Sequence, residues 1–196
     1  QALDLTKELL GEKHPQVATS LNNLARLYRE QKQYAKAEPL FLQALELRKK
    51  LLGEEHIYVA NSLGGLALLY LEQERYEEAE PLFLQTFELD KKLLGKEHHY
   101  VAEDLNNLAR LYRKQKQYEK AEPLNLQALE IAEKKLGVNH PKTVTIRENL
   151  QELRDKHQSS FTYRKPWYLK SSALVVYVFV LLLAVLISRF VLGTMG

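Results

Sequence analysis

The chain has 196 residues, of which 45% are hydrophobic, 28 are Lys or Arg, 25 are Asp or Glu, and none is Cys. This length suits one ordinary domain with a short appendage, and the lack of Cys excludes a disulfide framework, a thiolate zinc site and a cysteine nucleophile. The net charge of +3 does not indicate a nucleic-acid-binding domain, because residues 159–196 hold four basic residues and no acidic one, which leaves 24 basic and 25 acidic residues in positions 1–158.

The region 1–157 is a repeat array with a period of 42 residues. Residues 17–56 and 101–140 are identical at 29 of 40 positions. A fixed period of this length predicts a solenoid, in which each unit buries its apolar face by stacking on the next. In chain order we expect a partial repeat at 1–15, full repeats at 16–57, 58–99 and 100–141, and a capping helix at 142–157. Since the partial repeat aligns with the second half of a unit, we expect more repeats upstream.

Each full repeat predicts two helices joined by a turn. In the first one, four residues at positions i, i+3, i+4 and i+7 form an apolar helical face, namely Leu21, Leu24, Ala25 and Tyr28. After a polar break at 31–33, a second apolar pattern continues to Leu52. Gly53 then suits the left-handed position that ends a helix.

The C-terminal region differs from the repeats. Residues 158–171 predict a linker, and the fifteen residues 173–187 are all apolar or aromatic. A run without a polar face is typical of a membrane-spanning segment. Fifteen helical residues reach only about 22 Å, whereas the hydrocarbon core is about 30 Å thick. We therefore expect a single transmembrane helix over 172–193.

The residues that flank this run are of kinds found at membrane interfaces. They are Arg164, Lys165, Trp167, Tyr168, Lys170 and Arg189. Because most of the basic ones precede the run, the positive-inside rule predicts that the repeats face the cytoplasm and that the C-terminus lies across the membrane. The expected layout is a single-pass, tail-anchored protein in a lipid bilayer. The alternatives are an apolar helix that packs against a partner subunit and a fragment of a longer membrane protein.

The repeat resembles the tetratricopeptide repeat (TPR), and its 42-residue period with recurring Ala-Glu-Pro-Leu and Leu-Gly-x-x-His segments resembles the kinesin light chain type. The signature residues of the first full unit are Leu21, Leu24, Ala25, Tyr28, Tyr34, Ala37, Phe41 and Ala44. Two positions depart from the pattern, Thr86 in place of Ala and Asn125 in place of Phe. The resemblance implies an all-α solenoid of helix-turn-helix units that binds a protein or peptide on its concave face.

The first helices of the repeats are expected to line that face. Beside the buried stripe, the first and third repeats carry Asn and Arg, whereas the middle repeat carries Gly and Leu. We expect the groove to suit an acidic peptide with one large apolar anchor. The resemblance implies that the asparagines bond the peptide backbone. The candidate partner-binding residues are Asn22, Asn23, Arg26, Arg29, Gly64, Gly65, Leu68, Asn106, Asn107, Arg110 and Arg113.

Two adjacent glycines in a helix cost roughly 1 kcal/mol each relative to Ala. The cost at Gly64 and Gly65 suggests a close approach of the peptide backbone, although drift in a helix held by its neighbours explains them equally well.

The sequence predicts no catalytic residue, cofactor or metal. The histidines His14, His56, His98 and His140 recur at the repeat period, so each falls in a different inter-repeat turn, whereas metal ligands must converge within about 2 Å of one ion. A structural role in the turn is expected instead. No phosphate loop, zinc-protease motif or nucleophile elbow is present.

The sequence favours a membrane-anchored scaffold or adaptor that binds a protein partner. Two alternatives remain open: a permanent subunit of a larger membrane complex, and a regulatory module of a signalling protein whose N-terminal part is missing.

Overall fold

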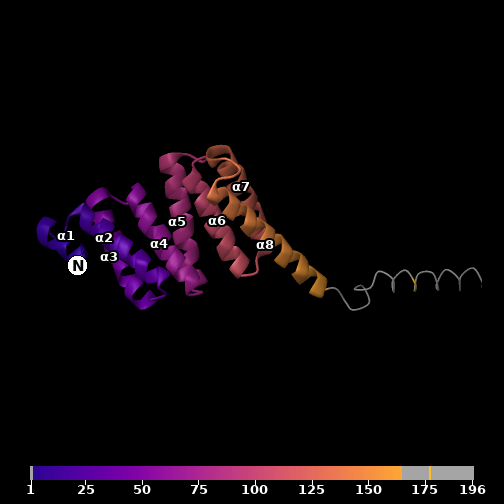
Figure 1. The fold of residues 1–196 in the computed structure, drawn as a ribbon, viewed down its shortest axis with the longest axis horizontal. Helices are drawn as coiled ribbons and strands as arrows, with labels where there is room; N and C mark the ends of the chain where they lie inside the picture. Colours follow the sequence, from indigo (N-terminus) through magenta and orange to yellow (C-terminus); the bar gives the residue numbers. More distant parts are fainter. Residues whose placement is uncertain (1, 165–176, 178–196) are drawn as a thin grey trace, which may run out of the picture. The chain divides into compact units, whose positions relative to one another are not determined.

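The computed structural model describes residues 2–164 and Tyr177. Within these residues the secondary structure is entirely α-helical (Figure 1). The helices are α1 (Ala2–Leu10), α2 (Pro15–Glu30), α3 (Tyr34–Leu52), α4 (Ile57–Glu72), α5 (Tyr76–Leu94), α6 (His99–Lys114), α7 (Tyr118–Leu136) and α8 (Pro141–Arg164). The predicted all-α class is confirmed for this part of the chain.

Residues up to Leu153 form one compact unit, a stack of helix pairs (Figure 1). The pairs α2/α3, α4/α5 and α6/α7 each fall within one 42-residue repeat, and consecutive pairs pack through α3 against α4 and through α5 against α6. The first helices also contact one another, α2 with α4 and α4 with α6. The predicted TPR-type solenoid is confirmed.

Helix ends explain why the repeat has these boundaries. His14, His56 and His98 are the N-cap residues of α2, α4 and α6, and in each the imidazole Nδ1 accepts a hydrogen bond from the backbone N–H two residues later, at 3.1–3.2 Å. His140 Nδ1 accepts from the N–H of Lys142 in the same way. The recurrent histidines therefore satisfy amide groups that a helix start leaves without a partner.

The core lies between the helix pairs. Phe41 and Phe83 occupy equivalent positions in α3 and α5, and their side chains are fully buried. They pack in one cluster with apolar residues of α4 and α6, such as Leu69 and Leu111. Tyr112 donates a hydrogen bond from its hydroxyl to Glu80 at 2.8 Å, which joins neighbouring repeats. Burial of this phenol, and to a smaller extent its hydrogen bond to Glu80, raises its pKa to about 12.

The C-terminal boundary differs from the expectation. α8 runs to Arg164, seven residues beyond the expected end of the capping helix at 157, so the predicted linker 158–171 begins as helix. No Gly or Pro lies between Pro141 and Pro166, so residues 142–164 contain no helix-breaking residue. From Arg154 onward the chain belongs to a second unit.

The membrane prediction concerns a part of the chain that lies outside the described residues. This applies to nearly all of the expected span 172–193, of which only Tyr177 is described, and to the interface residues Lys165, Trp167, Tyr168, Lys170 and Arg189. Arg164 is the last residue of α8. Among the helices of the described residues, none is both long and apolar enough to cross a membrane.

Candidate functional site

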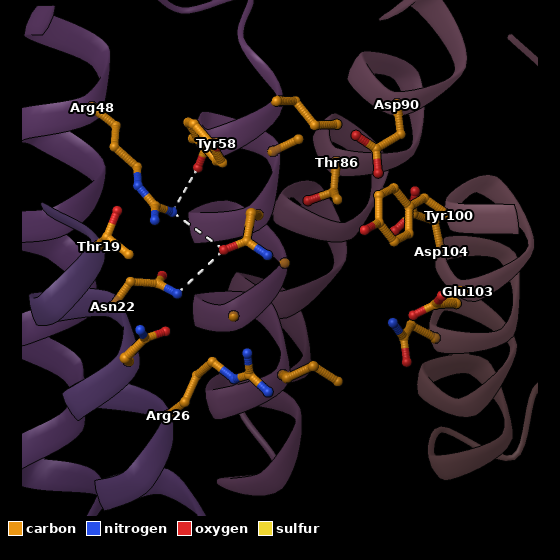
Figure 2. A pocket seen from close by; sticks show the side chains of 18 of the residues that line it. Thr19, Asn22, Arg26, Arg48, Tyr58, Thr86, Asp90, Tyr100, Glu103 and Asp104 are labelled. Atoms are coloured by element: carbon orange, nitrogen blue, oxygen red, sulfur yellow. Dashed lines mark hydrogen bonds between the residues drawn. The ribbon is translucent and has the colours of Figure 1, made fainter. Parts of the chain in front are cut away.

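A groove of about 570 Å³ runs along α2, α4 and α6, with contributions from α3 and α5 (Figure 2). Its lining includes eight of the eleven predicted residues: Asn22, Asn23, Arg26, Arg29, Gly64, Gly65, Leu68 and Asn107. The other three, Asn106, Arg110 and Arg113, are not part of the lining. The structure therefore brings together the candidates of the first and second repeats but only one from the third.

Asn22 belongs to a buried polar network at the α2 end of the groove. Its side chain is only 2% exposed, and its Nδ2 donates to Asn61 Oδ1 at 3.2 Å. The guanidinium of Arg48 donates from Nη1 to the same Asn61 oxygen at 3.2 Å and to the carbonyl of Tyr58 at 2.8 Å (Figure 2). It also donates to Ser62 Oγ at 2.7 Å. Asn22 thus joins the first repeat to the second while it lines the groove, and its role in binding a peptide stays a prediction.

Arg26 and Arg29 supply positive charge on the α2 side of the groove. Arg26 is exposed and forms no ion pair within the described part of the chain. Arg29 lies 3.6 Å from Glu72 through Nε, and its side chain is only 14% exposed. Because Arg29 is already neutralised in part, Arg26 is the cation of this wall that an incoming acidic group meets first.

Of the three predicted residues outside the groove, Asn106 and Arg113 have partners on α8. Asn106 accepts a hydrogen bond from Asn149 at 3.0 Å, and Arg113 forms an ion pair with Glu152. Burial, and then the charge of Arg113, lowers the pKa of Arg110. The first helix of the third repeat therefore does not extend the basic wall that its similarity to the first repeat predicted.

The α6 end of the groove is acidic. Asp90 on α5 and Asp104 on α6 line it together with Glu103, opposite Arg26 and Arg48 in Figure 2. Burial raises the pKa of Asp104 to about 9, with further contributions from the charges of Asp90 and Glu103. Burial also raises the pKa of Asp90 to about 6. The groove thus carries opposite charges at its two ends, whereas the sequence predicted basic walls on both sides.

The two glycines of α4 have different environments. A Cβ on Gly64 would be in ordinary van der Waals contact with Thr86, so this position tolerates a methyl group. Gly65 lies directly against the buried ring of Phe41. Gly65 allows α4 to pack closely on α3. This packing accounts for the glycine without the close approach of a peptide or drift that the sequence suggested.

Sequence reasoning missed Arg48, Asp90 and Asp104. Asp90 stands one period after Arg48, and Asp104 one period after Ser62, so both positions change chemistry between repeats that otherwise agree. That change was visible in the aligned repeats. Its meaning was not, because burial at the junction between helices is what makes an unpaired charge there costly.

No arrangement in the described residues suits a metal: they include no group of three or more His, Asp or Glu side chains placed to hold an ion.

Comparison with known proteins agrees with this architecture. The family model of the tetratricopeptide repeat matches residues 1–50, 28–92, 58–134 and 100–156. The chain belongs to the tetratricopeptide repeat family. Proteins of this family are typically binding scaffolds for other proteins or peptides and typically lack enzymatic activity. No curated protein matches the chain.

Solved structures resemble the fold. A kinesin light chain-like protein of Podosopora anserina with nearly identical TPR-like repeats is 27% identical, at a TM-score of 0.66, over 76% of this chain and 72% of that one. A variant of that protein is also 27% identical, at a TM-score of 0.64, over 84% of this chain and 85% of that one. BtubC (BKLC) from P. vanneervenii is 23% identical and shares the fold, with a TM-score of 0.68 over 94% of this chain and 70% of that one. The predicted resemblance to kinesin light chain repeats is confirmed at the level of structure.

Proposed function

We propose that this protein is a scaffold that captures an extended segment of a partner protein in the groove along α2, α4 and α6. The segment carries an acidic side chain that pairs with Arg26 and a large apolar side chain that packs on Leu68. Three features support this: the exposed cation on one wall, the half-buried leucine beside it, and a family whose members typically bind proteins.

The observation that carries the proposal is the position of Leu68. It lines the groove while its inner side packs against the main core cluster. An apolar side chain that packs on Leu68 loses water-exposed area, and each Å² buried stabilises the complex by roughly 25 cal/mol. Leu68 is already held in place by the core. The neighbouring Gly64 adds no side chain that would fill this space.

The test is selection of binders from a library of random short peptides, followed by affinity measurement with Arg26→Glu. The matched control is Lys50→Glu, which makes the same charge change at an exposed position outside the groove. We expect Arg26→Glu to weaken binding of the selected acidic peptides by about tenfold or more and Lys50→Glu to leave it unchanged. Equal affinities of the two variants would show that capture occurs elsewhere.

We also propose that a transmembrane helix at 172–193 anchors the scaffold, with the repeats on the cytoplasmic side. The support is the sequence: the fifteen apolar or aromatic residues at 173–187 and the basic residues before them. Deleting residues 172–196 should move the protein from the membrane fraction to the soluble fraction. An intact chain that is soluble without detergent would refute the anchor.

A further inference from the structure

Two equivalent junctions between repeats of the solenoid differ in their chemistry. The first junction consists of Arg48, Tyr58, Asn61 and Ser62, where α3 meets α4. The second junction consists of the residues one period later, where α5 meets α6, namely Asp90, Tyr100, Glu103 and Asp104. Three residues of the first junction, Arg48, Tyr58 and Asn61, and all four of the second line the groove (Figure 2).

At the first junction a buried cation is surrounded by oxygen atoms. The guanidinium of Arg48 is 4% exposed and donates to a carbonyl, an amide oxygen and a hydroxyl at 2.7–3.2 Å. Neutral acceptors suffice here because the chain supplies the positive charge itself.

At the second junction the acceptors are present and the cation is not. Asp90 and Asp104 are each 6% exposed and share a hydrogen bond between their carboxyl groups, but Oδ1 of Asp90 and Oδ2 of Asp104 are buried without a hydrogen-bond partner among the described residues. Glu103 differs, since it forms an ion pair with Lys142. Two buried carboxyl oxygens without partners are costly unless something satisfies them. Both side chains face the groove, from which a partner can reach them.

The groove also extends in front of the second junction, where Gly64 lines it. In the first repeat Asn22 fills the corresponding space and bonds to Asn61, whereas the equivalent residue of the second repeat is Gly64. A Cβ on Gly64 would meet no atom closer than Thr86 Cγ2, at 3.5 Å. The missing side chain therefore leaves room beside Asp104 and Glu103.

We propose that Asp90 and Asp104 form a binding site for a cationic side chain, Arg or Lys, of the peptide that occupies the groove. The guanidinium or ammonium group takes the place that Arg48 fills at the first junction and donates charge-assisted hydrogen bonds to both carboxyl groups, and Asp104 releases its proton to the solvent as the cation binds. This inference rests on the proposed function. It adds that the occupant carries a basic residue toward α6, beyond the acidic residue near α2 and the apolar residue over Leu68.

A side-chain cation fits the site better than a metal ion. The second junction is not a cluster of three ligating side chains arranged around one point, in the part of the chain that the structure describes. A planar guanidinium instead matches two carboxyl groups contributed by neighbouring helices.

The experiment uses the full chain in detergent and the random peptide library, with selection repeated on two variants. The double variant Asp90→Asn/Asp104→Asn keeps the shape and removes the charge. Gly64→Asn keeps the charge and places in front of Asp90 and Asp104 the same side chain that Asn22 has in the first repeat. Circular dichroism verifies that both variants are folded.

We expect peptides selected by the wild type to share a basic residue at a fixed distance from an acidic one. Replacing that basic residue by Gln should weaken binding to the wild type by about tenfold and to the double variant by less than about twofold. Gly64→Asn should weaken binding of the same peptides while Gly64→Ala does not.

The outcomes separate the two proposals. Wild-type peptides that share acidic and apolar residues but no basic one would overturn the cation site and leave peptide capture intact. The site would also be overturned if peptides selected by the double variant carried the basic residue as often as peptides selected by the wild type. Failure of the wild type to select any peptide would overturn the proposed function and the cation site together.

Discussion

A Cβ atom on Gly65 would lie 2.5 Å from Cε1 of Phe41, closer than carbon atoms approach one another. Phe41 is fully buried, so its ring cannot move aside into solvent. Gly65→Ala should therefore destabilise the protein by about 1–3 kcal/mol, because overpacking outweighs the better helix propensity of Ala. Urea unfolding followed by circular dichroism measures the change.

Gly64→Ala is the matched control, because its nearest neighbour is at an ordinary contact distance of 3.5 Å. Here we expect only the propensity gain, about 0.5–1 kcal/mol of added stability. Two variants of equal stability would contradict the packing role of Gly65.

Arg48 holds the first junction together through three acceptors. Arg48→Met keeps the length of the side chain but leaves Ser62 Oγ and the Tyr58 carbonyl without this donor, and we expect a loss of about 2 kcal/mol. Arg26→Met, at an exposed position, should change stability by less than about 0.5 kcal/mol. Equal melting temperatures of the two variants would show that the buried network does not contribute to stability.

Asp104 makes stability depend on pH. In the unfolded chain this carboxyl loses its proton near pH 4, while burial raises its folded-state pKa to about 9. Between these values the unfolded state binds fewer protons than the folded state, so stability falls as the pH rises. Asp104→Asn should be more stable than the wild type at pH 8, on the order of 2 kcal/mol, and similar to it at pH 4.

Thermal unfolding at several pH values tests this prediction. The stability curve of Asp104→Asn should be flatter than that of the wild type across this range. Wild-type and variant melting temperatures that change in parallel from pH 5 to pH 8 would show that the carboxyl is already ionised in the folded protein and that its pKa is not raised.

Asn125 replaces, in the third repeat, the phenylalanine found at positions 41 and 83. Its side chain is 1% exposed, and its Oδ1 has no hydrogen-bond partner among the described residues. Asn125→Leu should stabilise the protein by about 1–2 kcal/mol, since it removes an unsatisfied buried oxygen and adds apolar contact.

Asn23→Leu, at an exposed position of the groove wall, should give no such gain. Chemical denaturation distinguishes the two variants, and a destabilised Asn125→Leu would show that the amide has a structural partner.

Periodicity was sufficient to predict the helix pairs, because Leu21, Ala25 and Phe41 recur at the spacings that bury one face of each helix. The expected groove along the first helices was found where predicted. The charge of its walls was not, since a helix face is defined by spacing alone, whereas Arg113 pairs with Glu152 of α8 outside the groove and Asp90 and Asp104 add acidic groups to the α6 end. Those pairings depend on how repeats stack, which a single repeat does not encode.

Position 48 and its equivalents carry Arg48, Asp90 and Ala132, and all three side chains are buried. One backbone therefore accepts a cation, an anion and a methyl group at the same point of three successive helices. Each helix pair contacts only its neighbours, so such an exchange is felt locally and leaves the rest of the stack unchanged. The solenoid therefore keeps the same packing of its helix pairs while the chemistry of a single junction changes from one repeat to the next.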